Sequence, residues 1–223
     1  KRGWERIGQE RSFHNLRARL SVHKDADPHD QERRLPDFET WCRGASPSFS
    51  WHWDYLRLID RELAAVTRGE VRKLMIYIPF RHGKSEKVTV RYPIYRLEMD
   101  PTLPVIIGCY NQTLANRFSR KARKIAKSLG PERLPLSKER SAAEEWETAL
   151  GGGIRAAGVG AGITGMGGKR IMIDDPIKNR KEANSKAYRD AVWEWYTNDL
   201  YTRLEPGGSI VLIMTRWHED DLA

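Results

Sequence analysis

The chain has 223 residues, enough for one large domain with its own hydrophobic core. Its 39 lysines and arginines outnumber its 30 aspartates and glutamates, and the formal net charge of +9 favours a polyanionic partner such as nucleic acid. No apolar run approaches the roughly 20 residues of a membrane span, and the polar N-terminus lacks the apolar core of a secretory signal, so we expect no membrane association.

Residues 1–48 predict a polar N-terminal arm with one or two helices, because charges and prolines interrupt any sustained apolar period. A helix is predicted next, from about Trp53 to Arg68, where apolar side chains recur at helical spacing. The apolar segment KLMIYIPF, residues 73–80, predicts a buried β-strand. The segment after it predicts a turn and then a helix, with a kink or break at Pro93.

Apolar strands and helices alternate through the rest of the chain. Three more buried strands and two more helices are predicted, the strands at residues 103–111, 169–176 and 209–217 and the helices at 112–130 and 184–204. Residues 144–160 predict two strands around a glycine turn, and residues 205–208 predict a turn before the last strand. This alternation predicts an α/β fold, a mostly parallel sheet with helices on both faces.

The turn after the first strand ends in a phosphate-loop signature, Gly83-Lys84-Ser85. Amide groups at a helix N-terminus bind phosphate, a lysine at this place reaches the β- and γ-phosphates, and the serine ligates Mg²⁺. The usual first glycine is replaced by Ile78, which leaves a chance Gly-Lys-Ser in a surface turn as the alternative. The candidate nucleotide contacts are Pro79, Phe80, Arg81, His82, Gly83, Lys84, Ser85 and Glu86.

Polar residues follow two later strands. The segment KRIMIDDP ends in Asp174, expected to hold Mg²⁺ together with Ser85, and Asp175, expected to polarise the attacking water. Thr215 follows the last strand, and it either senses the γ-phosphate or simply ends the strand. An acidic turn alone could be merely solvated, but the two motifs together predict hydrolysis of a nucleoside triphosphate with Mg²⁺.

Several side chains leave alternatives open. Arg81 could neutralise transition-state charge within the chain and Arg155 could do so for a neighbouring subunit, or either could be structural or face DNA. An adenine could stack on one of Trp51, His52, Trp53 and Tyr55, of which Trp51 and His52 are the candidates, or these side chains could belong to the core. The basic helix at residues 112–130 could contact DNA or be a solvated face. The acidic turn after His218 favours solvation over metal binding.

Four segments together resemble the large terminase subunit of tailed bacteriophages over about residues 49–223: IPFRHGKSE, GCYNQTLANRFSR, GVGAGITGMGGKRIMIDDPIKNR and IVLIMTRWHEDDLA. The resemblance implies an additional-strand P-loop ATPase domain of a motor that uses ATP and Mg²⁺ to package double-stranded DNA into a procapsid. It also implies a ring, commonly of five subunits, on the portal protein, and a small terminase subunit as a partner. The implied location is the host cytoplasm and, transiently, the procapsid portal.

Carried over by position, Lys84 and Ser85 match the family's phosphate loop, Asp174 its Walker B aspartate, and Thr215 its coupling motif. Asp175 stands where most members have a catalytic glutamate, which is one methylene longer.

A second departure lies before this strand. Many members have an arginine in the loop where this chain has Thr164-Gly165-Met166, so Arg155 is the remaining candidate for a finger acting on a neighbouring subunit. The family's nuclease domain normally follows the ATPase domain, and the sequence stops at Ala223, so we expect ATP hydrolysis without DNA cleavage. A helicase-like DNA-remodelling ATPase and a DNA-binding module with an inactive nucleotide site are the alternatives.

Overall fold

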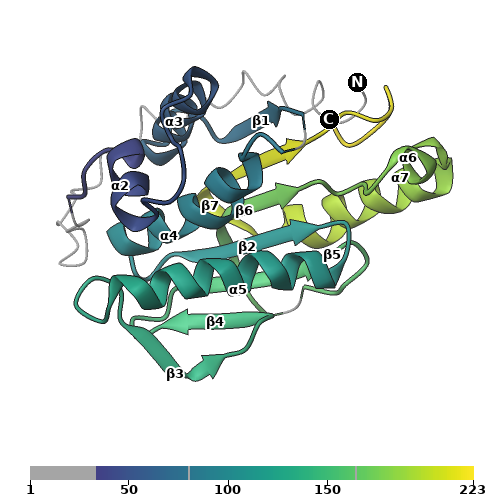
Figure 1. Ribbon diagram of the computed structural model, residues 1–223. Coiled ribbons are helices and arrows are strands. Elements are labelled where there is room, and N and C mark those ends of the chain that lie inside the picture. The colour runs from purple at the N-terminus through teal and green to yellow at the C-terminus, as the bar shows by residue number, and fades with distance from the viewer. Residues whose placement is uncertain (1–33, 80, 164) are drawn as a thin grey trace, which may run out of the picture.

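The computed structural model describes residues 34–79, 81–163 and 165–223. A seven-stranded sheet forms its centre, made of β1 (Lys73–Tyr77), β2 (Pro104–Cys109), β3 (Leu136–Ser141), β4 (Glu145–Thr148), β5 (Gly153–Gly158), β6 (Gly168–Asp174) and β7 (Leu204–Met214). The strand order is β1-β7-β6-β2-β5-β4-β3 (Figure 1). The first five strands in this order run parallel, and β4 and β3 continue the sheet in antiparallel pairs.

Helices cover the sheet on both faces. They are α2 (Phe38–Ala45), α3 (Asp54–Thr67), η2 (Ser85–Arg91), α4 (Tyr92–Met99), α5 (Gln112–Leu129), α6 (Arg180–Asn184), α7 (Lys186–Glu194), η3 (Trp195–Leu200) and the short turn η4 (Tyr201–Arg203). Alternate residues of β2 enter different apolar clusters: Val105 and Ile107 pack with α2 to α5, and Ile106 packs with α7 and η3. The predicted mostly parallel α/β fold is therefore confirmed.

One strand separates the two strands that carry the main motifs. β7 lies between β1, which leads into the Gly83-Lys84-Ser85 turn, and β6, which ends at Asp174. This is the additional strand that the resemblance implied. The predicted strand pair around a glycine turn is also present as β4 and β5. β3 was not predicted, because its sequence LSKERS is polar and mostly exposed.

The helix after the Gly83-Lys84-Ser85 turn is not broken at Pro93. Helical structure continues from Ser85 to Met99, with its first part, η2, in the wider π-helical form. A proline cannot donate to the carbonyl four residues earlier and crowds it, and a wider turn relieves that contact. Pro93 therefore accompanies a change from the π-helical form of η2 to the α-helical form of α4. The wider form of η2 determines the directions of its side chains.

Two other predicted boundaries shift. The predicted turn at residues 205–208 is a bulge inside β7, because Leu204 and Ser209 pair with Gly168 and Arg170, only two residues apart on β6. The long helix predicted at residues 184–204 divides into α7, η3 and η4.

The described end of the predicted N-terminal arm is packed against the domain. Phe38, Trp41 and Cys42 of α2 are buried in the same apolar cluster as α4. Trp41 Nε1 donates a 2.7 Å hydrogen bond to Glu98 of α4. The rest of the predicted arm, residues 1–33, lies outside the described residues. Within the described ranges, no helix has the length and apolar character needed to cross a membrane.

Candidate nucleotide site

Three parallel strands end together at one edge of the sheet. Tyr77, the last residue of β1, pairs with Met214 of β7, and Asp174, the last residue of β6, pairs with Ile213. The segments that follow these strands therefore meet, as expected for the ligand-binding edge of a parallel sheet.

Lys84 is the centre of this meeting point. It is 4% exposed, and its ammonium donates to Thr215 Oγ1 at 2.9 Å, to Asp175 Oδ1 at 3.1 Å and to the carbonyl oxygen of Ile78 at 3.4 Å. A buried lysine is stable only when its charge is paired and its three donors find acceptors. The side chain of Lys84 thus joins the Gly83-Lys84-Ser85 turn to the segments that follow β6 and β7.

Asp175 has a strained backbone that directs its carboxylate to this lysine. Its φ is 44°, in the left-handed region, and its amide donates to the carbonyl oxygen of Ile213 at 2.9 Å. Oδ1 accepts from Lys84 and also from the amide of Thr215, at 2.9 Å. Aspartate tolerates the left-handed region better than glutamate, because its short polar side chain bonds locally.

Strain is concentrated at this edge. Arg81, with φ 67°, and Asp175 are the two non-glycine residues with positive φ within the described ranges. Gly83 has φ 75°, and a Cβ there would meet open space, so glycine is needed for its backbone conformation. Unfavourable backbone conformations persist where the surroundings enforce them, and they cluster at functional sites.

Asp174 is buried beside Lys84, and only one of its two carboxylate oxygens has a hydrogen-bond partner among the described residues. Thr89 Oγ1 donates to its Oδ2 at 2.7 Å, while Oδ1 is buried and has no hydrogen-bond partner within the described residues. Burial, and next the charge of Asp175, raise the pKa of Asp174 to about 7. The hydroxyls of Thr89 and Ser85 oppose the increase.

These features fit a magnesium ion. The free Oδ1 of Asp174 is a hard anionic oxygen, and Ser85 begins the neighbouring helix. Mg²⁺ in nucleotide sites takes one or two protein oxygens and completes its octahedron with water and phosphate oxygens. Among the described residues, no three or more His, Cys, Asp and Glu side chains form a cluster that could hold a metal ion.

Comparison with known proteins identifies the family and a related fold. A family model described as terminase large subunit, T4likevirus-type, N-terminal, matches residues 75–223. The chain belongs to this family. Its fold also resembles the crystal structure of the HK97 bacteriophage large terminase, with a TM-score of 0.52 and 13% sequence identity over 73% of this chain and 34% of that one. The chain thus spans about a third of the length of that terminase. A search of curated proteins gave no match.

The loop residues before Gly83 were also predicted to contact nucleotide in this terminase domain. Arg81 is exposed and has no hydrogen-bond or ion-pair partner among the described residues. Pro79 and His82 are also exposed, and the His82 ring lies edge-on to Tyr55, with 5.8 Å between centroids. Phe80 lies outside the described residues. Arg81 is therefore free to reach a phosphate, and its role stays a prediction.

Glu86 faces away from the lysine. Its carboxylate accepts from Arg91 at 2.9 Å and pairs with Lys121 of α5. Burial tends to raise the pKa of Glu86, but these two cations outweigh burial and lower it. An ionised carboxylate held in this way would repel phosphate, so only the backbone of Glu86 suits the predicted nucleotide contact.

The two predicted adenine platforms differ in exposure. Trp51 is 3% exposed and donates to the carbonyl oxygen of Ser46 at 3.1 Å, so it belongs to the core and its predicted stacking role is wrong. His52 is exposed and stacks on Trp53, with 5.2 Å between centroids. His52 therefore stays the candidate.

Arg155 lies in the middle of β5, with Ile106 and Glu145 as its strand neighbours, and it is half-buried. It is not among the residues that meet at Lys84, and its predicted role towards a neighbouring subunit stays a prediction.

The acidic turn after β7 was expected to be solvated. The side chain of Asp221 is instead buried, and it accepts from Arg216 and from the amides of Trp217 and His218.

Sequence reasoning missed Thr89 and the side chains that fix η2. Lys87, fully buried, donates to Asp60 of α3 at 2.7 Å, and Arg91 packs its guanidinium 4.7 Å from the Trp51 ring. A signal did exist for Thr89, because it follows Ser85 by four residues and so lies near it on a helix. The polar residues Lys87 and Arg91 gave no such signal, since a lysine or arginine is usually exposed.

We predict that Thr89→Val weakens Mg²⁺ binding by about tenfold, since removing a hydrogen bond that orients a metal ligand typically has an effect of this size. Binding of Mn²⁺, followed by electron paramagnetic resonance in the presence of an ATP analogue, measures this directly. The matched control is Thr148→Val, another buried threonine whose hydroxyl donates to a backbone oxygen. Equal Mn²⁺ affinity in the two variants would contradict the role of Thr89.

The raised pKa of Asp174 predicts a pH-dependent stability in metal-free buffer. The unfolded carboxyl releases its proton near pH 4 and the folded one near pH 7, so stability falls as pH rises through this window. Relative to Asp174→Asn, the wild type should lose about 2 to 3 kcal/mol between about pH 5 and pH 8. Urea unfolding with a chelator at both values measures the difference, and parallel curves for the two proteins would refute it.

Proposed function

We propose that this chain is the ATPase domain of a viral DNA-packaging motor, which couples ATP hydrolysis to translocation of double-stranded DNA into a procapsid. The observation that carries the proposal is the convergence on Lys84 of Asp175 and Thr215, from the ends of two other strands, beside the half-satisfied Asp174. Family membership supports the packaging role.

ATP would bind with its phosphates at the N-terminus of η2. The amides there and the ammonium of Lys84 suit the β- and γ-phosphates. Ser85 and Asp174 would hold Mg²⁺, which when bound neutralises phosphate charge. Arg81 would add a further positive charge, and Arg155 is the candidate contributed by a neighbouring subunit.

The bond between Lys84 and Asp175 gives the site a means of control. Oδ1 of Asp175 already accepts from Lys84 and from the amide of Thr215. A γ-phosphate would compete for the ammonium and leave the carboxylate freer to accept a proton from water. The same competition would weaken the hydrogen bond from Lys84 to Thr215. Binding of the phosphate would therefore change the contacts of the segment after β7.

The proposed partners and location rest on analogy with the family. We infer double-stranded DNA, a portal protein and a small terminase subunit as partners, and a ring of subunits, five by family analogy. The motor would act in the host cytoplasm and transiently on the procapsid portal.

ATP hydrolysis by the chain, measured with and without duplex DNA at two salt concentrations, tests the proposal. We expect slow hydrolysis that DNA stimulates, and less stimulation at higher salt, because phosphate contacts release counterions. Unwinding of a forked duplex would favour the helicase-like alternative. DNA binding without hydrolysis, even in concentrated protein, would favour a non-enzymatic binding module.

A further inference from the structure

Helix α5 concentrates positive charge on its outer face. Its sequence contains no acidic residue and six basic ones, Arg117, Arg120, Lys121, Arg123, Lys124 and Lys127. The opposite face, which includes Ala115, Phe118 and Ala122, is buried against the sheet and η2. Like charges three or four residues apart on a helix repel one another, so this arrangement disfavours the helix unless an anion approaches it.

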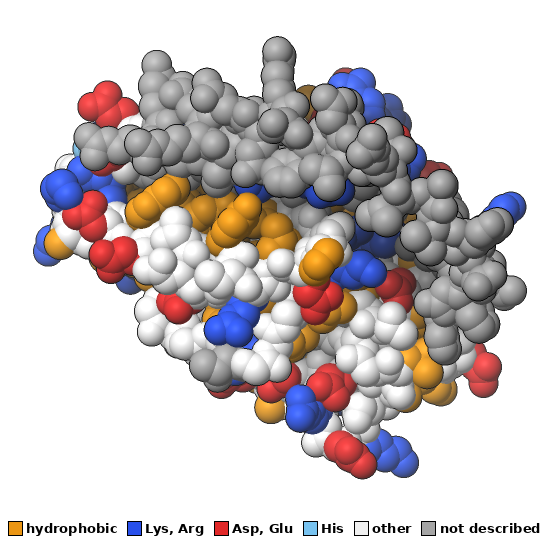
Figure 2. All heavy atoms as spheres, turned by 180° about the vertical axis from the view of Figure 1, so that it is seen from behind, with side chains coloured by type: hydrophobic (Ala, Val, Ile, Leu, Met, Phe, Trp, Pro, Cys, Tyr) orange, Lys and Arg blue, Asp and Glu red, His pale blue; other side chains and the backbone are white. Residues whose placement is uncertain are grey.

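Most of these cations are unpartnered. Four of them, Arg117, Arg120, Lys124 and Lys127, have no acidic or hydrogen-bonding partner among the residues that the structure describes. Other helices pair their charges: in α3, Arg57 lies near Asp54, and in α7, Lys186 bonds to Asp190. Figure 2, which views the opposite side, shows basic and acidic side chains intermixed over its described part.

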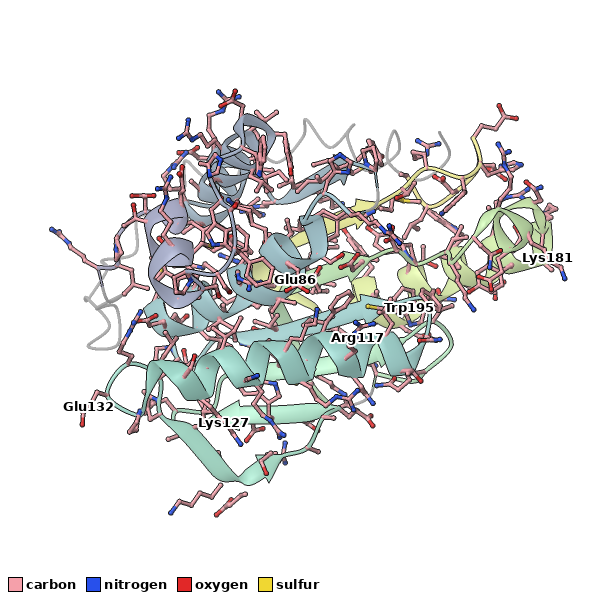
Figure 3. All side chains as sticks on the ribbon, viewed as in Figure 1. Glu86, Arg117, Lys127, Glu132, Lys181 and Trp195 are labelled. Carbon is pink, nitrogen blue, oxygen red and sulfur yellow. The ribbon has the colours of Figure 1, made fainter. Side chains whose placement is uncertain are left out.

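The basic surface extends beyond the helix. Arg117 and Lys127 lie towards the two ends of α5 (Figure 3). Between α5 and the β3–β4 hairpin lies a hollow of about 430 Å³, whose lining includes Lys127 and Lys138. Lys138 is exposed and also lacks a partner among the described residues. We call this surface, α5 with Lys138, the α5 face.

We propose that the α5 face binds the phosphate backbone of duplex DNA without reading its sequence. The choice of DNA as the polyanion rests on the proposed function. From Arg117 to Lys127 the helix extends about 15 Å, a length over which one DNA strand presents about four phosphates. The four unpartnered cations of α5 can meet phosphates without breaking an existing ion pair, and the helix has no acidic residue to repel them.

The α5 face is directly connected to the phosphate loop. Lys121 pairs with Glu86, the residue after Ser85, and α5 packs against η2. Phosphates drawn to α5 would compete with Glu86 for Lys121. DNA bound here would thus act on the first turn of the helix that receives ATP, through a single ion pair.

The test compares two triple variants of the 223-residue chain. Arg117→Gln/Arg120→Gln/Lys124→Gln removes charge from the α5 face but leaves Lys121 in place. The matched control, Arg61→Gln/Lys181→Gln/Lys186→Gln, removes the same charge from other exposed positions. Binding of a labelled duplex of about 20 base pairs is followed by fluorescence anisotropy over about 50 to 200 mM salt. Thermal melting checks that both variants fold.

We expect the α5 variant to bind at least about tenfold more weakly than the control, with a salt slope lower by up to about 3, since each lost phosphate contact lowers it by about 0.9. Equal binding by the two variants, or no measurable binding by the wild type at low salt, would overturn the proposal. The assay contains no nucleotide, so its failure is distinguishable from failure of the ATPase assignment.

Discussion

Replacing Lys84 by alanine is expected to reduce ATP hydrolysis by at least about 100-fold, the effect of removing one positive donor from a transition state that develops negative charge. The structure gives a second reason for this loss of activity, because Lys84 donates hydrogen bonds to both Asp175 and Thr215. ATP binding should weaken as well, because the β- and γ-phosphates lose their buried cation. Steady-state phosphate release and calorimetric titration with ATP measure the two effects.

The control for this variant is Lys181→Ala, which removes an exposed lysine of α6. It should hydrolyse ATP at the wild-type rate. Thermal melting of Lys84→Ala separates loss of function from loss of fold. If the Lys84→Ala protein folded and kept full activity, the assignment of the nucleotide site to this edge of the sheet would be wrong.

Asp175→Asn should lower hydrolysis by about 10²- to 10⁴-fold while ATP still binds, because an amide cannot accept the proton of the attacking water. Asparagine tolerates the left-handed backbone at φ 44°, and its amide oxygen can still accept from Thr215, so the fold should be retained. Single-turnover hydrolysis and ATP titration separate chemistry from binding. The matched control is Asp190→Asn, an exposed aspartate of α7.

Replacing Asp175 by glutamate tests the effect of the left-handed backbone at this position. The left-handed conformation at this position favours aspartate over glutamate, so Asp175→Glu should lower the free energy of unfolding by about 1 kcal/mol. Urea unfolding checks this value. If Asp175→Asn hydrolysed ATP as fast as the wild type, Asp175 could not be the group that activates water.

The sequence was sufficient to predict the parts of the site that follow strands. Apolar strands that alternate with helices require a parallel sheet, and their carboxyl ends must then meet, which brings Lys84, Asp175 and Thr215 together without knowledge of any contact. The tripeptide Gly83-Lys84-Ser85 was informative because it lay between a strand and a helix.

The remaining features depend on packing that local sequence does not encode. Pro93 predicted a kink or a break, but the helix continues through it, and the preceding π-helical part contains Thr89, which bonds to Asp174. Trp51 was one of several aromatic residues before the first strand, and only tertiary packing distinguishes its burial from the exposure of His52. β3 has a polar sequence and forms through its pairing with β4.

A crystal structure of the chain with Mg²⁺ and a non-hydrolysable ATP analogue tests the central claim most directly. The account predicts the γ-phosphate within hydrogen-bond distance of Lys84 Nζ, the ion between Ser85 and the free Oδ1 of Asp174, and Asp175 released from the lysine. A triphosphate bound elsewhere, or one bound while Lys84 still donates to Asp175, would contradict it.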